Sequence, residues 1–269
     1  MFATHNDRHQ VNPLKDIIMT TRKNTHYRSL IVFATLTGLS LPALAETQIS
    51  TGLVGFDSPY KGNKEDMGLF LEVYHKGERT TLDDRGLTYR VTPDHWENLE
   101  IGATLSSAGM GYDANDATST EGMKDRDASL DAGISIEYRQ GENVYRTTLV
   151  HDITNTHEGT LLDAQWHRNF AASDKLSVSP FAGLVYTSQD YNQYYFGVEA
   201  NEQTQQRAAY QADASVSAYL GYKAHYELSE QWGVVHSLTY AKLGSEIRQS
   251  SVVDDGNVWV TTAGIAYRF

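Results

Sequence analysis

The 269-residue sequence contains no cysteine, and this absence removes several classes of site at once. Without a thiol the chain has no disulfide framework, no thiolate metal site and no attachment point for a lipoprotein anchor. The sequence also lacks internal repeats, low-complexity runs and linker-like stretches. A single folded domain that needs no cofactor and no resident metal is therefore expected.

Basic residues are also scarce, with 22 Lys and Arg against 34 Asp and Glu and a formal charge of −12. The first 45 positions hold five of the basic and two of the acidic residues, so the remainder keeps 17 basic and 32 acidic residues and a charge of −15. This balance excludes binding to nucleic acid or to an anionic membrane surface through a basic patch. The mean hydropathy of −0.47 is typical of a soluble protein. The exception is a membrane barrel, whose strands face lipid only at every second residue.

Long hydrophobic runs are missing except at residues 30–41, which are too short and too often interrupted for a membrane-spanning helix. Arg22, Lys23 and Arg28 precede this run, and Ala43-Leu44-Ala45 follows it with the small-x-small pattern of a signal-peptidase site. Residues 1–45 are therefore predicted to be an N-terminal extension with a cleaved signal peptide, and residues 46–269 the mature domain. Met1 and Met19 both remain possible start positions.

The last twelve residues alternate between two faces, as a β-strand does. One face carries Trp259, Thr261, Ala263, Ile265, Tyr267 and Phe269, and the other carries Val258, Val260, Thr262, Gly264, Ala266 and Arg268. The aromatic C-terminus, with apolar residues two and four positions before it, resembles the signal that outer-membrane barrels present to the barrel assembly machinery. Ile265, Tyr267 and Phe269 are predicted to form that assembly signal.

Residues 210–228 alternate over a longer stretch than a soluble strand needs, and residues 130–138 and 99–106 repeat the pattern. A strand that crosses a bilayer at a tilt needs about 9 to 11 residues. The apolar rows are expected to face lipid and the polar rows the lumen. The sequence therefore predicts an all-β, transmembrane, antiparallel up-and-down barrel in the outer membrane, in contact with lipid and lipopolysaccharide.

The connections give the number of strands, because an even number of crossings places both ends in the periplasm. Tight turns are predicted at 75–77, 93–98, 140–143, 171–174 and 228–231, and long external loops at about 57–66, 107–127, 154–159, 189–208 and 247–257. A further external turn at Asp83-Asp84-Arg85-Gly86 gives twelve strands, with the third and fourth short; ten strands is the alternative. Pro180, which has no backbone donor, is expected to mark a bulge.

Several segments resemble the MipA/OmpV family of outer-membrane proteins. The resemblance is carried by Ser177-Val178-Ser179-Pro180-Phe181-Ala182-Gly183, Tyr194-Tyr195-Phe196-Gly197-Val198, Tyr219-Leu220-Gly221-Tyr222, Leu228-Ser229-Glu230-Gln231-Trp232 and Ala266-Tyr267-Arg268-Phe269, and further by Asp152, His157, Gly159 and Pro59-Tyr60-Lys61-Gly62. It covers the mature chain, most clearly from residue 160 onward.

The resemblance implies a non-enzymatic scaffold in peptidoglycan metabolism, with a lytic transglycosylase and a murein synthase as partners. A narrow porin and an adhesin are the alternatives. The lumen rows carry the charged and histidine side chains that could line a channel or form a plug, namely Asp131, Glu137, Arg139, Asp163, His167, Asp213, Lys223, His225 and Glu227.

Two other side-chain sets suggest chemistry more weakly. His151 and Asp152, together with Asp83 and Asp84, could form a protease site if the barrel mouth brought them together around a water molecule. Asp113, Asp116, Glu121, Asp125 and Asp127 crowd one loop but lack the order of a calcium-binding loop, so a solvated acidic loop is expected.

Trp96 and Trp232 lie in predicted periplasmic turns, where they are candidate anchors of a partner-binding rim. The alternative is that both belong to the aromatic girdle that fixes the barrel in lipid.

Overall fold

The alternation of apolar and polar residues places most of the chain in long, sequentially paired strands. The computed structural model describes residues 30–32, 46–64, 66–109 and 111–269. The wall strands are β2 (Glu46–Phe56), β3 (Met67–Lys76), β4 (Thr80–Asp83), β5 (Gly86–Arg90), β6 (Leu99–Ser106), β7 (Asp131–Gln140), β8 (Asn143–Asp152), β9 (Thr160–Arg168), β11 (Leu176–Thr187), β12 (Ser215–Glu227), β13 (Trp232–Lys242) and β14 (Asn257–Arg268). Two short strands, β1 (Leu30–Val32) and β10 (Phe170–Ala171), join the sheet beside them.

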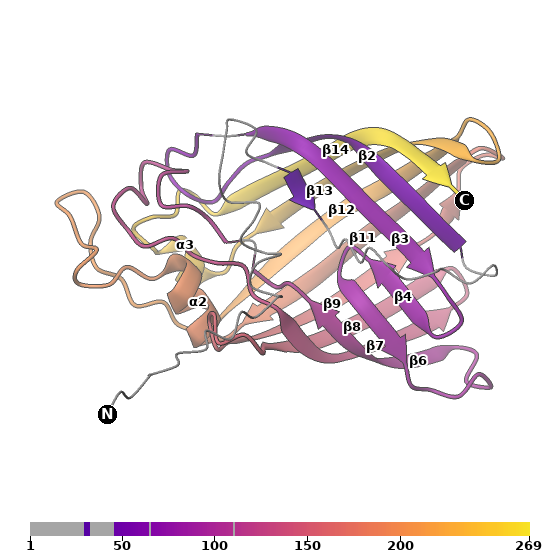
Figure 1. Cartoon of the computed structure of the whole chain (residues 1–269), viewed down its shortest axis with the longest axis horizontal. Helices are drawn as coiled ribbons and strands as arrows, with labels where there is room; N and C mark the ends of the chain where they lie inside the picture. Colours follow the sequence, from indigo (N-terminus) through magenta and orange to yellow (C-terminus); the bar gives the residue numbers. More distant parts are fainter. Residues whose placement is uncertain (1–29, 33–45, 65, 110) are drawn as a thin grey trace, which may run out of the picture.

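Within the described residues the wall is a closed ring of twelve antiparallel strands (Figure 1). Each strand pairs with its neighbour in sequence, the last strand β14 pairs with β2, and β3 pairs with β4. The predicted fold class and the number of strands are therefore confirmed. Closure satisfies most of the backbone hydrogen bonds that a membrane leaves without water partners.

The two faces of the wall follow the predicted rows. Side chains of the apolar rows lie on the outer surface with exposed fractions of 50 to 57%, as in Leu53, Leu69, Ile134, Leu184, Leu220 and Ile265. Side chains of the opposite rows, among them Ser135, Glu137 and Thr148, are buried inside the ring. In the bilayer the apolar outer surface faces lipid, which places the protein as a transmembrane barrel.

The connections separate into two kinds, as predicted. Short turns join β3 to β4, β7 to β8 and β12 to β13 at the end where the C-terminus lies, while the longer loops gather at the other end with the helices α2 (Gln189–Phe196) and α3 (Ser245–Arg248) (Figure 1). None of the helices within the described residues reaches the length and hydropathy of a membrane-spanning helix.

Two details of the strand prediction are wrong. The strand expected from residue 210 begins only at Ser215, because Tyr210 pairs with Val198 and residues 210–214 belong to the external loops. The bulge expected at Pro180 is absent: β11 keeps one continuous register with β12 through this residue. The missing proline donor is instead accommodated where the ladder between β9 and β11 ends, since that pairing stops at Phe181.

The residues of the predicted signal peptide lie outside the described residues, apart from Leu30–Val32. These three residues pair in parallel with Leu69–Leu71 of β3.

The C-terminal strand ends in a row of contacting aromatic rings. Trp232 packs edge-on against Tyr267, and Tyr267 packs edge-on against Phe269, each with ring centroids 4.9 Å apart. The backbone N–H of Phe269 donates to the carbonyl of Thr47 on β2, so the last residue lies at the seam between the first and last wall strands. Phe269 itself is 72% exposed, so its side chain is accessible at the surface, as the predicted assembly signal requires.

Deleting Phe269, or changing it to Asp, is expected to leave unassembled protein in the periplasm, because either change removes the aromatic end of this signal. The measurement is heat-modifiable migration of outer-membrane fractions on gels. Phe170→Asp, at an exposed aromatic position away from this seam, is the control. Normal migration and yield of the Phe269 variants would contradict an assembly role.

Candidate functional site

The external loops pack into a folded cap over one mouth of the barrel. This loop cap consists of residues 57–64, 111–130, 153–159, 188–214 and 243–256. Its core contains the buried side chains Met123, Tyr195, Phe196, Val198, Ile247, Val252 and Val253. The Tyr60 hydroxyl donates to the carbonyl of Tyr195 at 3.0 Å, and burial raises the pKa of Tyr60 well above its ordinary value. The loops therefore pack into one folded unit and are not independent of one another.

A buried ion pair holds two loops of the cap together. Arg126 and Glu202 are 3.2 Å apart, with side chains 7% and 3% exposed. Burial would raise the pKa of Glu202, but hydrogen bonds from the backbone N–H groups of Lys124 and Glu199, together with Arg126, hold it below its ordinary value. The loop carrying Arg126 is thus tied to the loop carrying Glu202 by a charge that must stay ionised.

The acidic loop predicted from the sequence is part of this cap, where its carboxylates bond to neighbouring loop residues. Asp125 accepts from the backbone N–H of Ala114, and Glu121 pairs with Lys64 at 2.7 Å. Among the described residues no group of three or more His, Asp or Glu side chains is arranged to hold a metal ion.

A serine, a histidine and an aspartate that the sequence analysis did not group together meet beneath the cap. Ser129 donates to Asp131 at 2.7 Å, and His157 Nε2 lies 3.0 Å from the Ser129 hydroxyl. The backbone N–H of Gly159 donates to His157 Nδ1, so the ring proton lies on Nε2 and is donated to the serine. A nucleophilic serine needs the opposite direction, with the imidazole accepting its proton. This cluster fixes the 153–159 loop and does not activate Ser129.

The predicted protease set is not brought together. His151 points to the outside, where it hydrogen-bonds Thr160, whereas Asp83 lies inside the barrel against Arg146 at 2.8 Å. Asp152 is buried and accepts from backbone N–H groups of the loop that follows it, including those of Thr156 and His157. The protease hypothesis is therefore wrong, because alternation along the strands separates its residues onto different faces.

The lumen is crossed by the tip of the hairpin formed by β4 and β5. Gly86, with a φ of +117°, makes the tight reversal at residues 83–86 that the sequence predicted as a turn. The predicted external position of this turn is wrong: Asp84 pairs with Lys223 of β12 at 2.7 Å, and Arg85 bonds Gln165 of β9. Since β12 lies opposite β5 in the ring, the tip reaches across the lumen.

Below the tip, charged side chains neutralise one another in a continuous row. Arg146 contacts both Asp83 and Glu137, and Arg139 contacts both Glu137 and Glu100. A polar cavity of about 660 Å³, including the open space at its mouth, lies beside this row. Of the predicted lumen residues, Asp213 is misplaced, because it lies in the loop cap. Glu137, Arg139 and Lys223 are ion-paired inside the barrel, and Asp163 accepts a hydrogen bond from the Tyr219 hydroxyl. Asp131 lies beneath the cap, and His225 and Glu227 line a recess at the opposite rim.

The two candidate anchors lie on the rim opposite the cap, but far from each other. Trp96, 44% exposed, lies in the connection from β5 to β6, and Trp232, 47% exposed, begins β13. Strands β6 and β13 are on opposite sides of the ring. A small recess of about 190 Å³ next to Trp232 is lined by Gln48, His225, Glu227, Ser229, Glu230, Gln231, Trp232, Ala266 and Arg268.

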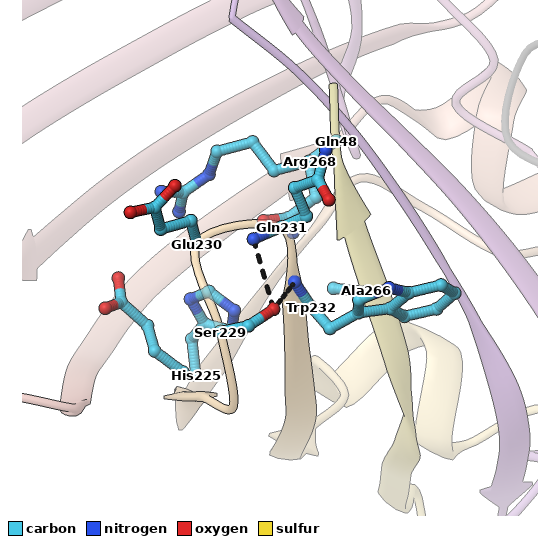
Figure 2. A pocket seen from close by; sticks show the side chains of 9 residues that line it. Gln48, His225, Ser229, Glu230, Gln231, Trp232, Ala266 and Arg268 are labelled. Atoms are coloured by element: carbon cyan, nitrogen blue, oxygen red, sulfur yellow. Dashed lines mark hydrogen bonds between the residues drawn. The ribbon is translucent and has the colours of Figure 1, made fainter.

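Figure 2 shows how this recess is built. The Ser229 hydroxyl oxygen accepts from the backbone N–H groups of Gln231 and Trp232, which fixes the turn. The indole of Trp232 lies beside Ala266, while Glu230 and Arg268 gather on the other side of the turn. The rim thus offers an exposed aromatic ring next to charged side chains.

Comparison of the sequence with known proteins identifies its family. The sequence profile of the family described as MltA-interacting protein MipA matches residues 49–269. The chain belongs to the MipA family. The predicted family and the outer-membrane location are confirmed by named relatives.

Outer membrane protein OmpV of Vibrio cholerae is 34% identical over 220 residues, covering 81% of this chain and 84% of that protein. The MltA-interacting protein of Escherichia coli is 26% identical over 242 residues, covering 89% of this chain and 96% of that protein. Among solved structures, a bacterial polysaccharide outer membrane secretin superposes with a TM-score of 0.43 at 11% identity, covering 84% of this chain and 98% of that one, which is too low to support an argument. The named relatives are outer-membrane or interacting proteins.

The cap is expected to open in acid. Because the folded-state pKa of Glu202 is lowered, its contribution to stability is fully present above its unfolded pKa of about 4.3 and is lost as the pH falls below that value. Hydrogen exchange of residues 188–214, followed by mass spectrometry and corrected for intrinsic rates, should speed up below about pH 4.

Glu202→Gln should open the cap already at neutral pH, because it leaves Arg126 buried without its counter-charge. The expected destabilisation of the folded cap is about 3–5 kcal/mol. Exchange in this segment should rise at least tenfold. Glu199→Gln is the matched control, since Glu199 makes only an exposed 3.6 Å pair with Lys124. Equal exchange in the two variants would rule out the buried pair as the lock of the cap.

Proposed function

We propose that the protein is a non-enzymatic adaptor that binds a lytic transglycosylase, and with it a murein synthase, at the periplasmic rim of the barrel. The observation that carries the proposal is the blocked passage through the barrel. The loop cap covers the outer mouth, and the hairpin tip pairs with the opposite wall inside. A barrel that is filled in this way offers its surfaces, and not a channel, for function.

The name of the relative in Escherichia coli, MltA-interacting protein, supports a murein enzyme as the partner. Such an enzyme works on the periplasmic side, where the short turns leave a low, polar rim. Exposed tryptophans beside charged groups are the usual anchors of protein interfaces. Because Trp96 and Trp232 lie on opposite sides of the ring, a partner that uses both must span the barrel end.

Rim charges provide the sharpest test. Glu97, Glu142, Asp174 and Glu230 are exposed in four different periplasmic turns. Reversing all four to Lys should reduce co-purification of the lytic transglycosylase at least tenfold, because charges at an interface rim govern association. The matched control reverses four exposed carboxylates of the loop cap, Glu158, Asp190, Glu199 and Asp254, and changes the net charge equally. Unchanged co-purification in the rim variant would exclude the rim as the binding surface.

A separate substitution distinguishes an anchor from a lipid girdle. Trp232→Ala should reduce partner retention while leaving barrel assembly intact, whereas Trp259→Ala, at the other end of the neighbouring strand β14, should leave retention unchanged. If both substitutions only lower the thermal stability of the barrel, Trp232 belongs to the girdle.

The porin alternative predicts a steady current through the barrel. Single-channel recording of the purified protein at neutral pH is expected to give no conductance above background, since both the cap and the hairpin tip obstruct the path. Regular conductance steps would overturn the adaptor proposal in favour of a narrow channel.

A further inference from the structure

Within the described residues, the wall has one incomplete joint, between β3 and β4. Every other neighbouring pair of wall strands is joined by four or more register pairs, but β3 and β4 share only His75 with Leu82 and Lys76 with Thr81. The pairing with β3 stops because β4 ends at Asp83 and the tip of the β4–β5 hairpin turns into the lumen, where Asp84 reaches Lys223. Residues 68–74 of β3 therefore have no wall strand on that side.

We call this edge of β3, which no described wall strand covers, the lateral notch; it lies in the upper half of the barrel wall. Residues 68–74 bound it on one side and the hairpin of β4 and β5 below. Above it, the loops close again, because Asn63 bridges Ala117 and Lys64 donates from its backbone N–H to the carbonyl of Asp116. The free edge is roughly 20 Å long at about 3.3 Å per residue.

Such an edge is costly in a membrane. Every second residue of a strand directs its N–H and C=O to one side, and in hydrocarbon each unsatisfied group costs several kcal/mol. The outer side chains of this stretch are apolar, with Leu69 54% exposed, so the edge lies in the lipid-facing surface. Acyl chains cannot supply the missing donors and acceptors, but a peptide backbone can.

The structure places a peptide on this edge. Leu30–Val32 runs parallel to β3, with Leu30 opposite Leu69, Ile31 opposite Phe70 and Val32 opposite Leu71. These residues belong to the segment that the sequence predicts to be removed during export. The edge is thus suited to a parallel, extended, apolar strand, and a mature chain that begins at Glu46, as the sequence predicts, would not provide one.

We infer that residues 68–74 of β3 are a strand-acceptor site, which binds an extended apolar segment of another envelope protein in parallel, from the outer face toward the periplasm. A second copy of this chain does not fit. Two copies in one membrane are related by an axis along its normal, so two β3 strands tilted by about 35–45° would cross at twice that angle and could not form a ladder. The inference does not depend on the adaptor role.

The test uses protein purified from outer membranes, with its N-terminus determined by mass spectrometry, and a synthetic peptide of residues 26–34 as the probe. Amides of residues 68–74 should exchange at least tenfold faster than those of β14, which is paired on both sides, and the peptide should slow them by a similar factor. Slow exchange of these amides in the absence of peptide would overturn the inference. This holds whether the amides are protected by the rest of the wall or by a retained N-terminal segment.

Register is tested by crosslinking, which the absence of native cysteine makes simple. A peptide with Val32→Cys should form a disulfide with barrel variant Leu71→Cys at least ten times faster than with Leu220→Cys, a lipid-facing position on β12 that is paired on both sides. Equal rates at the two positions would indicate partition into the detergent or lipid and would overturn the site.

Backbone methylation gives the matched control. One peptide carries an N-methyl group at Ile31, and a second carries N-methyl groups at Leu30 and Val32. Because neighbouring residues direct their N–H groups to opposite sides, only one of the two peptides should lose the ability to protect residues 68–74. If both peptides protect equally well, binding does not use a strand ladder.

Discussion

The backbone hydrogen bonds around the ring are the constraint on which the rest of the structure depends. In a bilayer each strand must satisfy its polar groups on both neighbours, so the ring has to close. The long strands from β7 to β14 and on to β2 meet this requirement along most of their length. The short hairpin of β4 and β5 meets it only in part, because its tip is drawn into the lumen by Lys223 and Gln165.

This compromise links three features that otherwise look unrelated. The same hairpin tip that obstructs the lumen also withdraws a partner from the upper half of β3 and leaves the lateral notch. Above the notch, Asn63 and Lys64 join their loop to the loop that enters the cap, so the cap spans the weak joint from outside. The obstruction of the lumen and the uncovered edge of β3 are both consequences of where two short strands end.

The charged side chains inside the barrel differ from those in the cap in how they are paired. In the lumen, Arg146 and Arg139 share carboxylates along a row, so each arginine there has more than one counter-charge. In the cap, Arg126 and Glu202 are almost fully buried, and removing either one leaves the other without compensation. The structure of the cap should therefore respond to pH.

The sequence by itself determined the barrel, its twelve strands, the faces of those strands and the family, because alternation with a period of two is a local property that each strand repeats. It also located the turn at Asp83-Asp84-Arg85-Gly86, since turn residues act within four positions. Only the tertiary structure decided that this turn points into the lumen, that residues 210–214 join the cap, and that Ser129, Asp131 and His157 meet. Each of these depends on contacts between residues that are separated in the sequence, from Val198 with Tyr210 to Asp84 with Lys223, 139 positions apart, and the alternation within one strand does not encode such contacts.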